Sequence, residues 1–358
     1  MIMKILAINP GSTSTKIAVF EDLVMKYEQT FRHSVEELSG YESIIEQYEF
    51  RRDVILEFLK HQNDSPDSID LFVGRGGLVK PIPGGVYRVN ESLLRDLRKG
   101  VMGEHASNLG GILAYEIAKS VGKKEESFIV DPVVVDELDE IARFSGRPEL
   151  PRLSIFHALN QKAVARRFAR EHNRKYQDLS LIVVHLGGGI TVGAHKNGRV
   201  VDVNNGLDGD GPFSPERAGS LPSGALVKLC FSGKYQLHEV RKMITGAGGM
   251  VAYLGTNNGT EVEKKIENED CQAKMVYLAM AYQIAKEIGA CAAVLSGRID
   301  AIILTGGLAY SEMLTKWISK RVAFLAPVHI YPGEDELQAL VEGVYYAAKG
   351  EIQIRDYV

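Results

Sequence analysis

The residues most informative about chemistry lie in two short turns, each between two apolar segments. The first turn reads NPGSTS at residues 9–14, and the second is Gly187–Gly189. The flanking segments are residues 4–8 and 15–20 for the first turn, and 181–186 and 190–194 for the second. Turns of Gly, Ser and Thr expose backbone N–H groups and hydroxyls with no bulk above them, so each can cradle an anion. Two facing cradles would hold a polyphosphate, which predicts a two-lobed phosphoryl-transfer protein.

Two arginines lie on loops rich in small residues. Arg75 stands in the turn GRGG at 74–77, directly after an apolar strand, and Arg217 stands in PERAG at 215–219. A planar guanidinium can grip a carboxylate or a phosphate through two hydrogen bonds. From position alone, an exposed loop arginine is the favoured interpretation.

Other candidate groups stand at the ends of expected elements. His157 lies at an expected helix start, His185 ends an apolar strand, and Asp131 follows the short strand 127–130. A lone histidine is often structural, and Asp-Pro is also a turn former. The acidic run 334–336 fits a helix N-terminus, where the dipole favours acids, so all of these keep a structural alternative.

Composition restricts the class of protein. A length of 358 residues suggests about two domains, and 45% hydrophobic with 25% charged residues indicates a globular chain. The net charge of −4 argues against a nucleic-acid binder. No apolar stretch approaches the roughly 18 residues that span a bilayer, so no membrane is expected. The three cysteines form no CxxC pair, which predicts a reduced, cytoplasmic setting with buried thiols.

Hydrophobic periodicity predicts the same order of elements in both halves. Expected strands cover residues 5–8, 15–20, 25–30, 69–73, 127–130, 181–186, 190–195, 199–203 and 301–305, and expected helices cover 41–60, 91–98, 107–119, 155–170, several segments between 223 and 293, one after Gly307, and 336–349. A three-strand meander followed by alternating helices and strands, written twice, predicts an α/β protein of two domains. We expect an N-terminal lobe over residues 1–152, a C-terminal lobe over 153–334, and a return of the last helix, within 335–358, to the first lobe.

No GxxxxGK[ST] and no GxGxxG opening a helix occur. Phosphates held by strand–turn–strand cradles resemble the superfamily of actin, the sugar kinases and the heat-shock chaperones, which implies a duplicated actin/ribonuclease H-like fold with an interdomain cleft. Within it, Asn9–Lys16 resembles the signature Asn-x-Gly-Ser-x-Ser-x-Lys of the acetate and butyrate kinases. His185–Gly189 is similar to their second phosphate loop, and Phe156-His157 to the segment of their catalytic histidine. The resemblance extends from residue 3 to about residue 345.

This resemblance implies a role for each candidate residue. Arg75 and Arg217 would clamp the substrate, and His157 would donate a hydrogen bond to the transferring phosphoryl group. The implied contacts to ATP or ADP are Ser12, Ser14, Lys16, His185, Gly187, Gly188 and Gly189, with Gly306 and Gly307 on the adenine side. The implied Mg²⁺ site comprises Asn9, Asp131 and Glu336, and the register between Asp335 and Glu336 stays open.

Departures from acetate kinases bear on the substrate. Gly188 replaces a usual Asn, and Asn257–Thr260 replaces an Asp-x-Arg element, which leaves the purine contacts open. Gly76 and Gly77 stand where acetate kinases place valines that narrow the acyl pocket, and residues 103–108 look more like butyrate kinases. Loss of two side chains predicts room for a longer acyl chain, unless other residues refill the space.

The sequence therefore predicts an ATP-dependent carboxylate kinase that forms an acyl phosphate from butyrate or isobutyrate. The family resemblance further implies a homodimer or a higher even homo-oligomer. An acetate or propionate kinase is the alternative substrate class. A sugar kinase is a more distant alternative, and a nucleotide-dependent switch ATPase of the same fold is the alternative without a kinase reaction.

Overall fold

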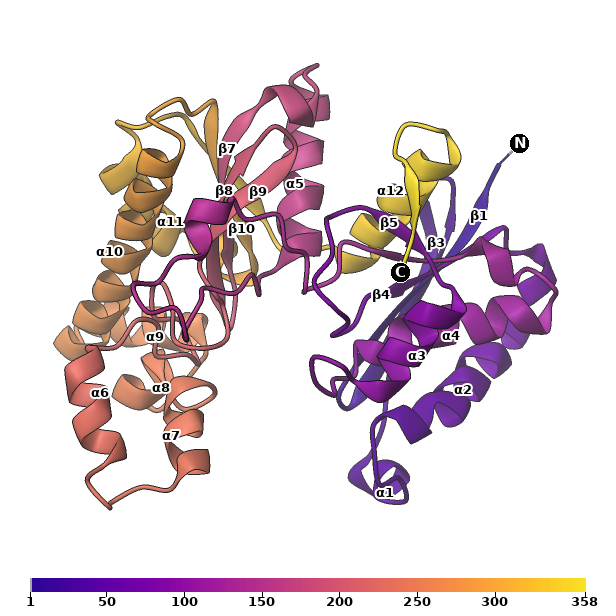
Figure 1. Cartoon of the computed structure of the whole chain (residues 1–358), viewed down its shortest axis with the longest axis horizontal. Coiled ribbons are helices and arrows are strands. Elements are labelled where there is room, and N and C mark those ends of the chain that lie inside the picture. The colour runs from indigo at the N-terminus through magenta and orange to yellow at the C-terminus, as the bar shows by residue number, and fades with distance from the viewer. Residues whose placement is uncertain (1) are drawn as a thin grey trace. The chain divides into compact units, whose positions relative to one another are not determined.

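The computed structural model describes residues 2–358, which form two compact units (Figure 1). The first unit contains the chain up to Val135 together with Asp335–Val358, and the second unit is Asp136–Glu334. The division thus lies at residue 135, where the sequence suggested 152. The segment 136–152 belongs to the second unit because it is bonded there: Asp139 N donates to Val201 O at 2.9 Å, and Arg152 pairs with Asp202 at 2.8 Å.

The first unit is built on a seven-stranded sheet in the order β12-β5-β6-β4-β1-β2-β3. Strands β1, β2 and β3 form an antiparallel meander, while β4 and β6 continue the sheet parallel to β1. The strands are β1 Lys4–Gly11, β2 Ser14–Glu21, β3 Val24–Arg32, β4 Leu71–Arg75, β5 Val86–Arg88, β6 Ser127–Val130 and β12 Ile354–Asp356.

Helices cover both faces of this sheet. Ile8 and Ile17 point to a core shared with Ile55 of helix α2 and Leu113 of helix α4. Helix α12 packs on the strands from the other face, where Gly343 lets it approach closely, since a Cβ there would lie 2.7 Å from the Val130 side chain. The helices are α1 Val35–Leu38, α2 Tyr48–His61, α3 Glu91–Lys99, α4 Asn108–Ser120 and α12 Glu336–Ala348.

The second unit has a five-stranded sheet in the order β11-β10-β7-β8-β9. Its strands are β7 Ser180–Leu186, β8 Ile190–Lys196, β9 Arg199–Val203, β10 Ala301–Gly306 and β11 Val328–Pro332. Its helices are α5 Ala158–Glu171, α6 Ser223–Cys230, α7 Leu237–Ile244, α8 Gly249–Leu254, α9 Gly259–Glu267, α10 Cys271–Val294 and α11 Glu312–Val322. One face packs on α5 and the other on α10 and α11.

The two sheets share one topology. In both, a meander of three antiparallel strands (β1–β3 and β7–β9) is extended from its first strand by two parallel strands, β4 and β6 in one unit and β10 and β11 in the other. This repeat confirms the predicted duplicated α/β fold.

The predicted elements are largely confirmed, with three differences. The helix expected from Tyr41 begins at Tyr48, after a 3₁₀ turn, and the helix expected from residue 155 begins at Ala158, because His157 has ψ 62° and lies outside the helical region. Strands β5, β11 and β12 were not predicted, because they are three to five residues long and two of them, β11 and β12, contain no buried residue.

The cysteine expectation was wrong for two of the three thiols. Cys230 and Cys271 are exposed, and Cys291 is buried against Val192 of β8. No helix among residues 2–358 is long and apolar enough to cross a membrane.

Candidate active site

The first glycine turn joins β1 to β2 and presents a polar face. Asn9 lies opposite Lys16 in the antiparallel register, and Gly11 lies opposite Ser14, so Asn9, Ser14 and Lys16 share one face of the sheet. The Lys16 ammonium lies 2.9 Å from the Glu28 carboxylate of β3. Ser12 is exposed at the tip of the turn.

Arg75 ends β4, next to the end of β1, on that same face. Gly74 and Gly110 allow the end of β4 to approach α4 backbone to backbone, since a Cβ on Gly74 would lie 1.9 Å from Gly110 O. The Arg75 Nη1 atom lies 2.8 Å and 2.9 Å from the two carboxylate oxygens of Glu336 and 3.5 Å from Asn9 Oδ1. Within residues 2–358, its Nε and Nη2 atoms have no hydrogen-bond partner. The edge that can bind a carboxylate through two hydrogen bonds is therefore available.

The two acidic residues at the start of α12, Asp335 and Glu336, make different contacts. Asp335 is the N-cap, and its side chain accepts a hydrogen bond from Gln338 N at 3.1 Å. Glu336, the first helical residue, reaches Arg75 and accepts a hydrogen bond from Asn9 Nδ2. Glu336, and not Asp335, is thus placed beside Asn9.

Asp131 occupies a tight turn after β6. It is buried, has φ +37°, and its Oδ1 accepts a hydrogen bond from Gly85 N at 2.7 Å, while its own N–H donates to Gly85 O at 3.0 Å. These contacts give the carboxylate a structural role in holding residue 85.

The side chains around Arg75 can be tested as ligands for the implied Mg²⁺. The described part of the chain contains no group of three or more His, Cys, Asp or Glu side chains arranged for a metal ion. Glu336 is an oriented carboxylate, 19% exposed, beside the amide of Asn9. Because Mg²⁺ usually takes one or two carboxylates with waters and phosphate oxygens, this donor set fits an ion that arrives with a polyphosphate.

The predicted open space beside Arg75 is absent. A Cβ on Gly76 would lie 2.6 Å from Pro132 Cβ, and one on Gly77 would lie 2.5 Å from Asn108 Cα. Asn108 is fixed there because its Oδ1 accepts a hydrogen bond from Leu78 N at 2.8 Å. The pocket argument was wrong, because neighbouring residues fill the space that the missing side chains leave.

In the second unit, the turn 187–189 joins β7 to β8. A Cβ on Gly189 would lie 2.1 Å from Arg217 Nη1, and one on Gly187 would lie 2.8 Å from His185 Nε2. Gly188 differs, since its Cβ would meet only Glu216 at 3.5 Å. Two of the three glycines therefore make room for candidate side chains.

Arg217 is held against this turn from the loop after β9. Its Nη1 donates to Gly206 O, whereas its Nε and Nη2 have no hydrogen-bond partner in the described residues. Burial lowers the pKa of Arg217. A guanidinium in this position, with an edge left for a ligand, suits an anion.

His157 and His185 lie face to face. Their ring centroids are 3.7 Å apart and the rings are 9° from parallel. His185 Nδ1 lies 2.9 Å from Asn160 Oδ1. Its Nε2 lies 3.7 Å from a Glu334 carboxylate oxygen.

A buried chain of hydrogen bonds fixes the tautomer of His157. Gln161 Nε2 donates to Thr191 O at 3.1 Å, and this carbonyl, which can only accept, fixes the amide orientation. Gln161 Nε2 also donates to Thr191 Oγ1 at 2.8 Å, and His157 Nδ1 lies 3.0 Å from the same oxygen. If the ring donated to that oxygen, the hydroxyl proton would be buried without an acceptor, which is costly. The hydroxyl therefore donates to His157 Nδ1, and the ring proton resides on Nε2.

The same chain continues into the core. Gln161 Oε1 lies 3.0 Å from His195 Nε2 and so accepts from it, and His195 Nδ1 accepts from the Tyr176 hydroxyl at 2.7 Å. Burial lowers the pKa of His195 well below its ordinary value, so this ring is neutral. Gly193 permits the contact, since a Cβ there would lie 2.4 Å from Gln161 Oε1.

The third glycine turn follows β10, which is parallel to β7 with Thr305 beside His185. The carboxyl ends of these strands therefore bring Gly306 next to the turn 187–189. Gly306 has φ +92° and its Cβ would lie 2.4 Å from Leu186 O, so only glycine fits. No atom lies within 4 Å of a Cβ on Gly307.

Known proteins provide a comparison for the whole chain. The pattern of the acetokinase family matches residues 151–328. Butyrate kinase 2 of Clostridium acetobutylicum is 60% identical over 357 residues, the full length of both chains. The chain belongs to the acetokinase family.

Solved structures show the same fold at low identity. The acetate kinase of Porphyromonas gingivalis is 18% identical, with 96% of this chain and 99% of that chain covered and a TM-score of 0.78. A propionate kinase of Francisella tularensis is 17% identical, with 95% and 98% covered and a TM-score of 0.73. The resemblance to acetate and butyrate kinases is confirmed.

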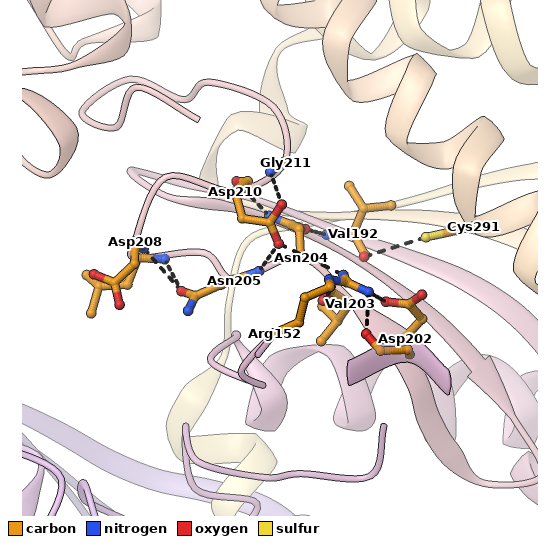
Figure 2. A network of polar contacts seen from close by, with 12 residues as sticks. Arg152, Val192, Asp202, Val203, Asn204, Asn205, Asp208, Asp210, Gly211 and Cys291 are labelled. Carbon is orange, nitrogen blue, oxygen red and sulfur yellow. Dashed lines mark hydrogen bonds and ion pairs between the residues drawn. The ribbon is translucent and has the colours of Figure 1, made fainter. Parts of the chain in front are cut away.

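In this acetokinase-family chain, a polar network surrounds the end of β9 and the turn that follows it (Figure 2). This turn begins the loop that leads to Arg217. Asn204 accepts from Val192 N at 2.7 Å and donates to Ile190 O at 3.1 Å, which ties the end of β9 to β8. Asn205 N donates to Asp210 at 3.0 Å and closes the next turn. The loop therefore leaves the sheet in a fixed direction toward Arg217.

Sequence reasoning missed the residues that support the histidines. Thr191, Gln161 and His195 look like ordinary residues of a strand and a helix. The available signal was that Gln161 stands four residues after His157, which places both on one side of a helix start. Asn257 and Asn258, where the family usually has an Asp-x-Arg element, contact Glu216 and cap α9.

Proposed function

We propose that the protein transfers the γ-phosphoryl group of ATP reversibly to butyrate or a branched short-chain acid. The products are an acyl phosphate and ADP. The observation that carries the proposal is the 60% identity with a butyrate kinase over the full length of both chains, so the similarity extends over both units.

The reaction needs little from the protein besides positioning. A carboxylic acid is ionised at neutral pH, so its oxygen can attack the γ-phosphorus without a general base. The bond from that phosphorus to the bridging oxygen of ADP breaks, and no proton is transferred. Catalysis then consists of alignment and charge neutralisation.

In the first unit, Arg75 would hold the carboxylate through its Nε–Nη2 edge. Ser12, Ser14 and Lys16 would contact the polyphosphate, with Lys16 exchanging Glu28 for phosphate. Asn9 and Glu336, with Asp131 through water, would hold Mg²⁺. The ion would neutralise charge on the phosphate oxygens when bound.

In the second unit, Arg217 would stabilise the phosphoryl group, and His157 would donate to it from Nε2. His185, stacked on His157, and the turn 187–189 would contact the phosphates. Gly306 and Gly307 would border the nucleoside, where Gly307 leaves open space.

The acyl length rests on the relative and not on the glycines beside Arg75. Solved acetate and propionate kinases share the fold at 17–18% identity, which argues for the fold alone. Acetate or propionate kinase therefore remains the alternative substrate class. A homodimer or higher even homo-oligomer and a cytoplasmic setting are part of the proposal.

The test is a substrate series. Purified protein is given ATP and Mg²⁺ with straight and branched acids of two to six carbons, and acyl phosphate is trapped with hydroxylamine. A maximum at butyrate or isobutyrate supports the proposal, and a maximum at acetate or propionate would replace the substrate. ATP binding without any acyl phosphate would favour a nucleotide-dependent switch.

A further inference from the structure

A buried arginine, Arg51 of α2, lies beneath the first glycine turn. Its side chain is completely buried, and its Nη1 donates to Gly11 O at 2.8 Å and Ser14 O at 2.8 Å. Its Nη2 donates to Ser12 O at 3.0 Å. One guanidinium thus holds three backbone carbonyls of a single turn.

The remaining acceptors of Arg51 are also neutral. They are Thr15 Oγ1 at 3.1 Å, and Gln47 Oε1 at 2.8 Å from Nη2 and 3.2 Å from Nε. No Asp or Glu in residues 2–358 lies within ion-pair distance of this side chain. Burial lowers the pKa of Arg51 to about 10, so it remains charged at neutral pH. The core therefore contains a cation without a counter-ion.

A buried charge without a counter-ion lowers the stability of the folded protein. The turn next to Arg51 suggests what function the charge has. A trans peptide places its N–H opposite its C=O, so the carbonyls of Gly11 and Ser12, which point to Arg51, direct the N–H groups of Ser12 and Thr13 away from it. Both residues are exposed, and neither N–H has a protein acceptor in the described chain. Outward N–H groups above a buried cation form a site for an anion.

The other cations near this turn differ from Arg51. Lys16 lies on the opposite face of β2 and is paired with Glu28 at 2.9 Å. Arg32 of β3, opposite Ser14, is exposed to solvent. Arg51 is thus the buried positive charge beneath the turn, and no carboxylate balances it.

We propose that Arg51 is a positioning residue for the polyphosphate of the nucleotide, holding the turn 11–15 with its N–H groups outward and supplying the balancing charge from below. This inference rests on the proposed function, because ATP supplies the polyphosphate. Arg51 touches no reacting atom.

The test compares two substitutions and two ligands. Arg51→Lys keeps the charge, whereas Arg51→Gln keeps a hydrogen-bond donor and removes the charge. Affinities for ADP and for adenosine are measured by titration calorimetry or ligand-observed NMR. We expect Arg51→Gln to weaken ADP binding by about 10-fold to 100-fold, the loss typical of a charge-assisted contact. Arg51→Lys should weaken ADP binding less than Arg51→Gln does. Both variants should bind adenosine with the affinity of the wild type.

Other outcomes overturn the inference in distinguishable ways. If folded Arg51→Gln binds ADP as the wild type does, the charge has no role. If ADP and adenosine weaken equally, the arginine only maintains the fold. If the wild type binds no ADP, the proposed function fails as well. If Arg51→Gln does not fold, amide hydrogen exchange of the wild type provides the test. ADP should protect the N–H groups of Ser12 and Thr13 from exchange. Unchanged exchange of these two groups would refute the anion site.

Discussion

Two neighbouring glycines allow function to be separated from stability. A Cβ on Gly189 would lie 2.1 Å from Arg217 Nη1, a distance that no real Cβ tolerates, whereas one on Gly188 would lie 3.5 Å from Glu216, an ordinary contact. Neither glycine has positive φ, so alanine is acceptable to both backbones. Gly189→Ala must therefore displace the end of the Arg217 side chain, and Gly188→Ala need displace nothing.

The size of the effect follows from what moves. Because the clash is with the tip of a flexible side chain, relief costs little stability, about 1 kcal/mol by comparison with mild overpacking. Displacing an arginine that stabilises a phosphoryl group lowers kcat by about 10³-fold. The assay is acyl hydroxamate formation, with the melting temperature measured in parallel.

We expect Gly189→Ala to fold normally and to lose activity. Gly188→Ala should also fold normally and should lose far less activity, because a loss there would come from contact with the nucleotide and not from displacement of Arg217. Equal activity of the two variants would refute the assigned role of Arg217. A large loss of stability in Gly189→Ala would instead refute the claim that only the arginine tip has to move.

Four further predictions concern single side chains. Arg75→Ala and Arg217→Ala should each lower kcat by about 10³-fold in hydroxylamine assays of correctly folded protein, and near-normal turnover removes the affected residue from the mechanism. Thr191→Val should lower kcat by about 10-fold, whereas Thr191→Ser, which keeps the hydroxyl, should not. Equal losses of kcat in the two variants would mean that the hydroxyl does not set the tautomer of His157. The pKa of buried His195 is lowered on folding, so its contribution to stability is present above pH 6.5 and is lost as the pH falls. Between pH 6.5 and 5.5, urea unfolding should show wild type losing about 1 kcal/mol more than His195→Gln, and parallel curves would contradict a neutral ring. A thiol reagent should modify two cysteines in native protein and reach Cys291, whose pKa burial raises, only after unfolding; three reactive native thiols would contradict its burial.

The fold was predictable because its evidence is local. The segment 4–21 has a run of apolar residues on either side of one turn of small residues, and the same pattern recurs at 181–195. Each copy therefore specifies a hairpin by itself, and duplication specifies the rest. The short strands β5 and β12 have no such pattern of their own. β12 pairs with β5, more than two hundred positions earlier in the chain, and β5 also pairs with β6, so both depend on tertiary contacts.

The site was predictable only at the level of motifs. Glu336 reaches Arg75 across 261 positions of the chain, and no local pattern decides between it and Asp335. Arg51 sits in a polar helix where an arginine indicates an exposed face, and its burial depends on how α2 lies under the first turn. Sequence identifies which residues can do chemistry, while tertiary packing decides which of them are oriented for it.

The glycines show the physical reason for this limit. A glycine in a sequence can indicate a position where a neighbour lies too close for a side chain, but it does not say which neighbour. Around Gly77 the neighbour is Asn108, and around Gly189 it is Arg217. Among the glycines of the three candidate turns (residues 11, 187–189 and 306–307), only Gly188 and Gly307 leave room for a Cβ. A direct requirement for glycine imposed by a bound nucleotide can therefore be sought at these two positions. There, substitution by alanine tests contact with the ligand without disturbing a protein neighbour.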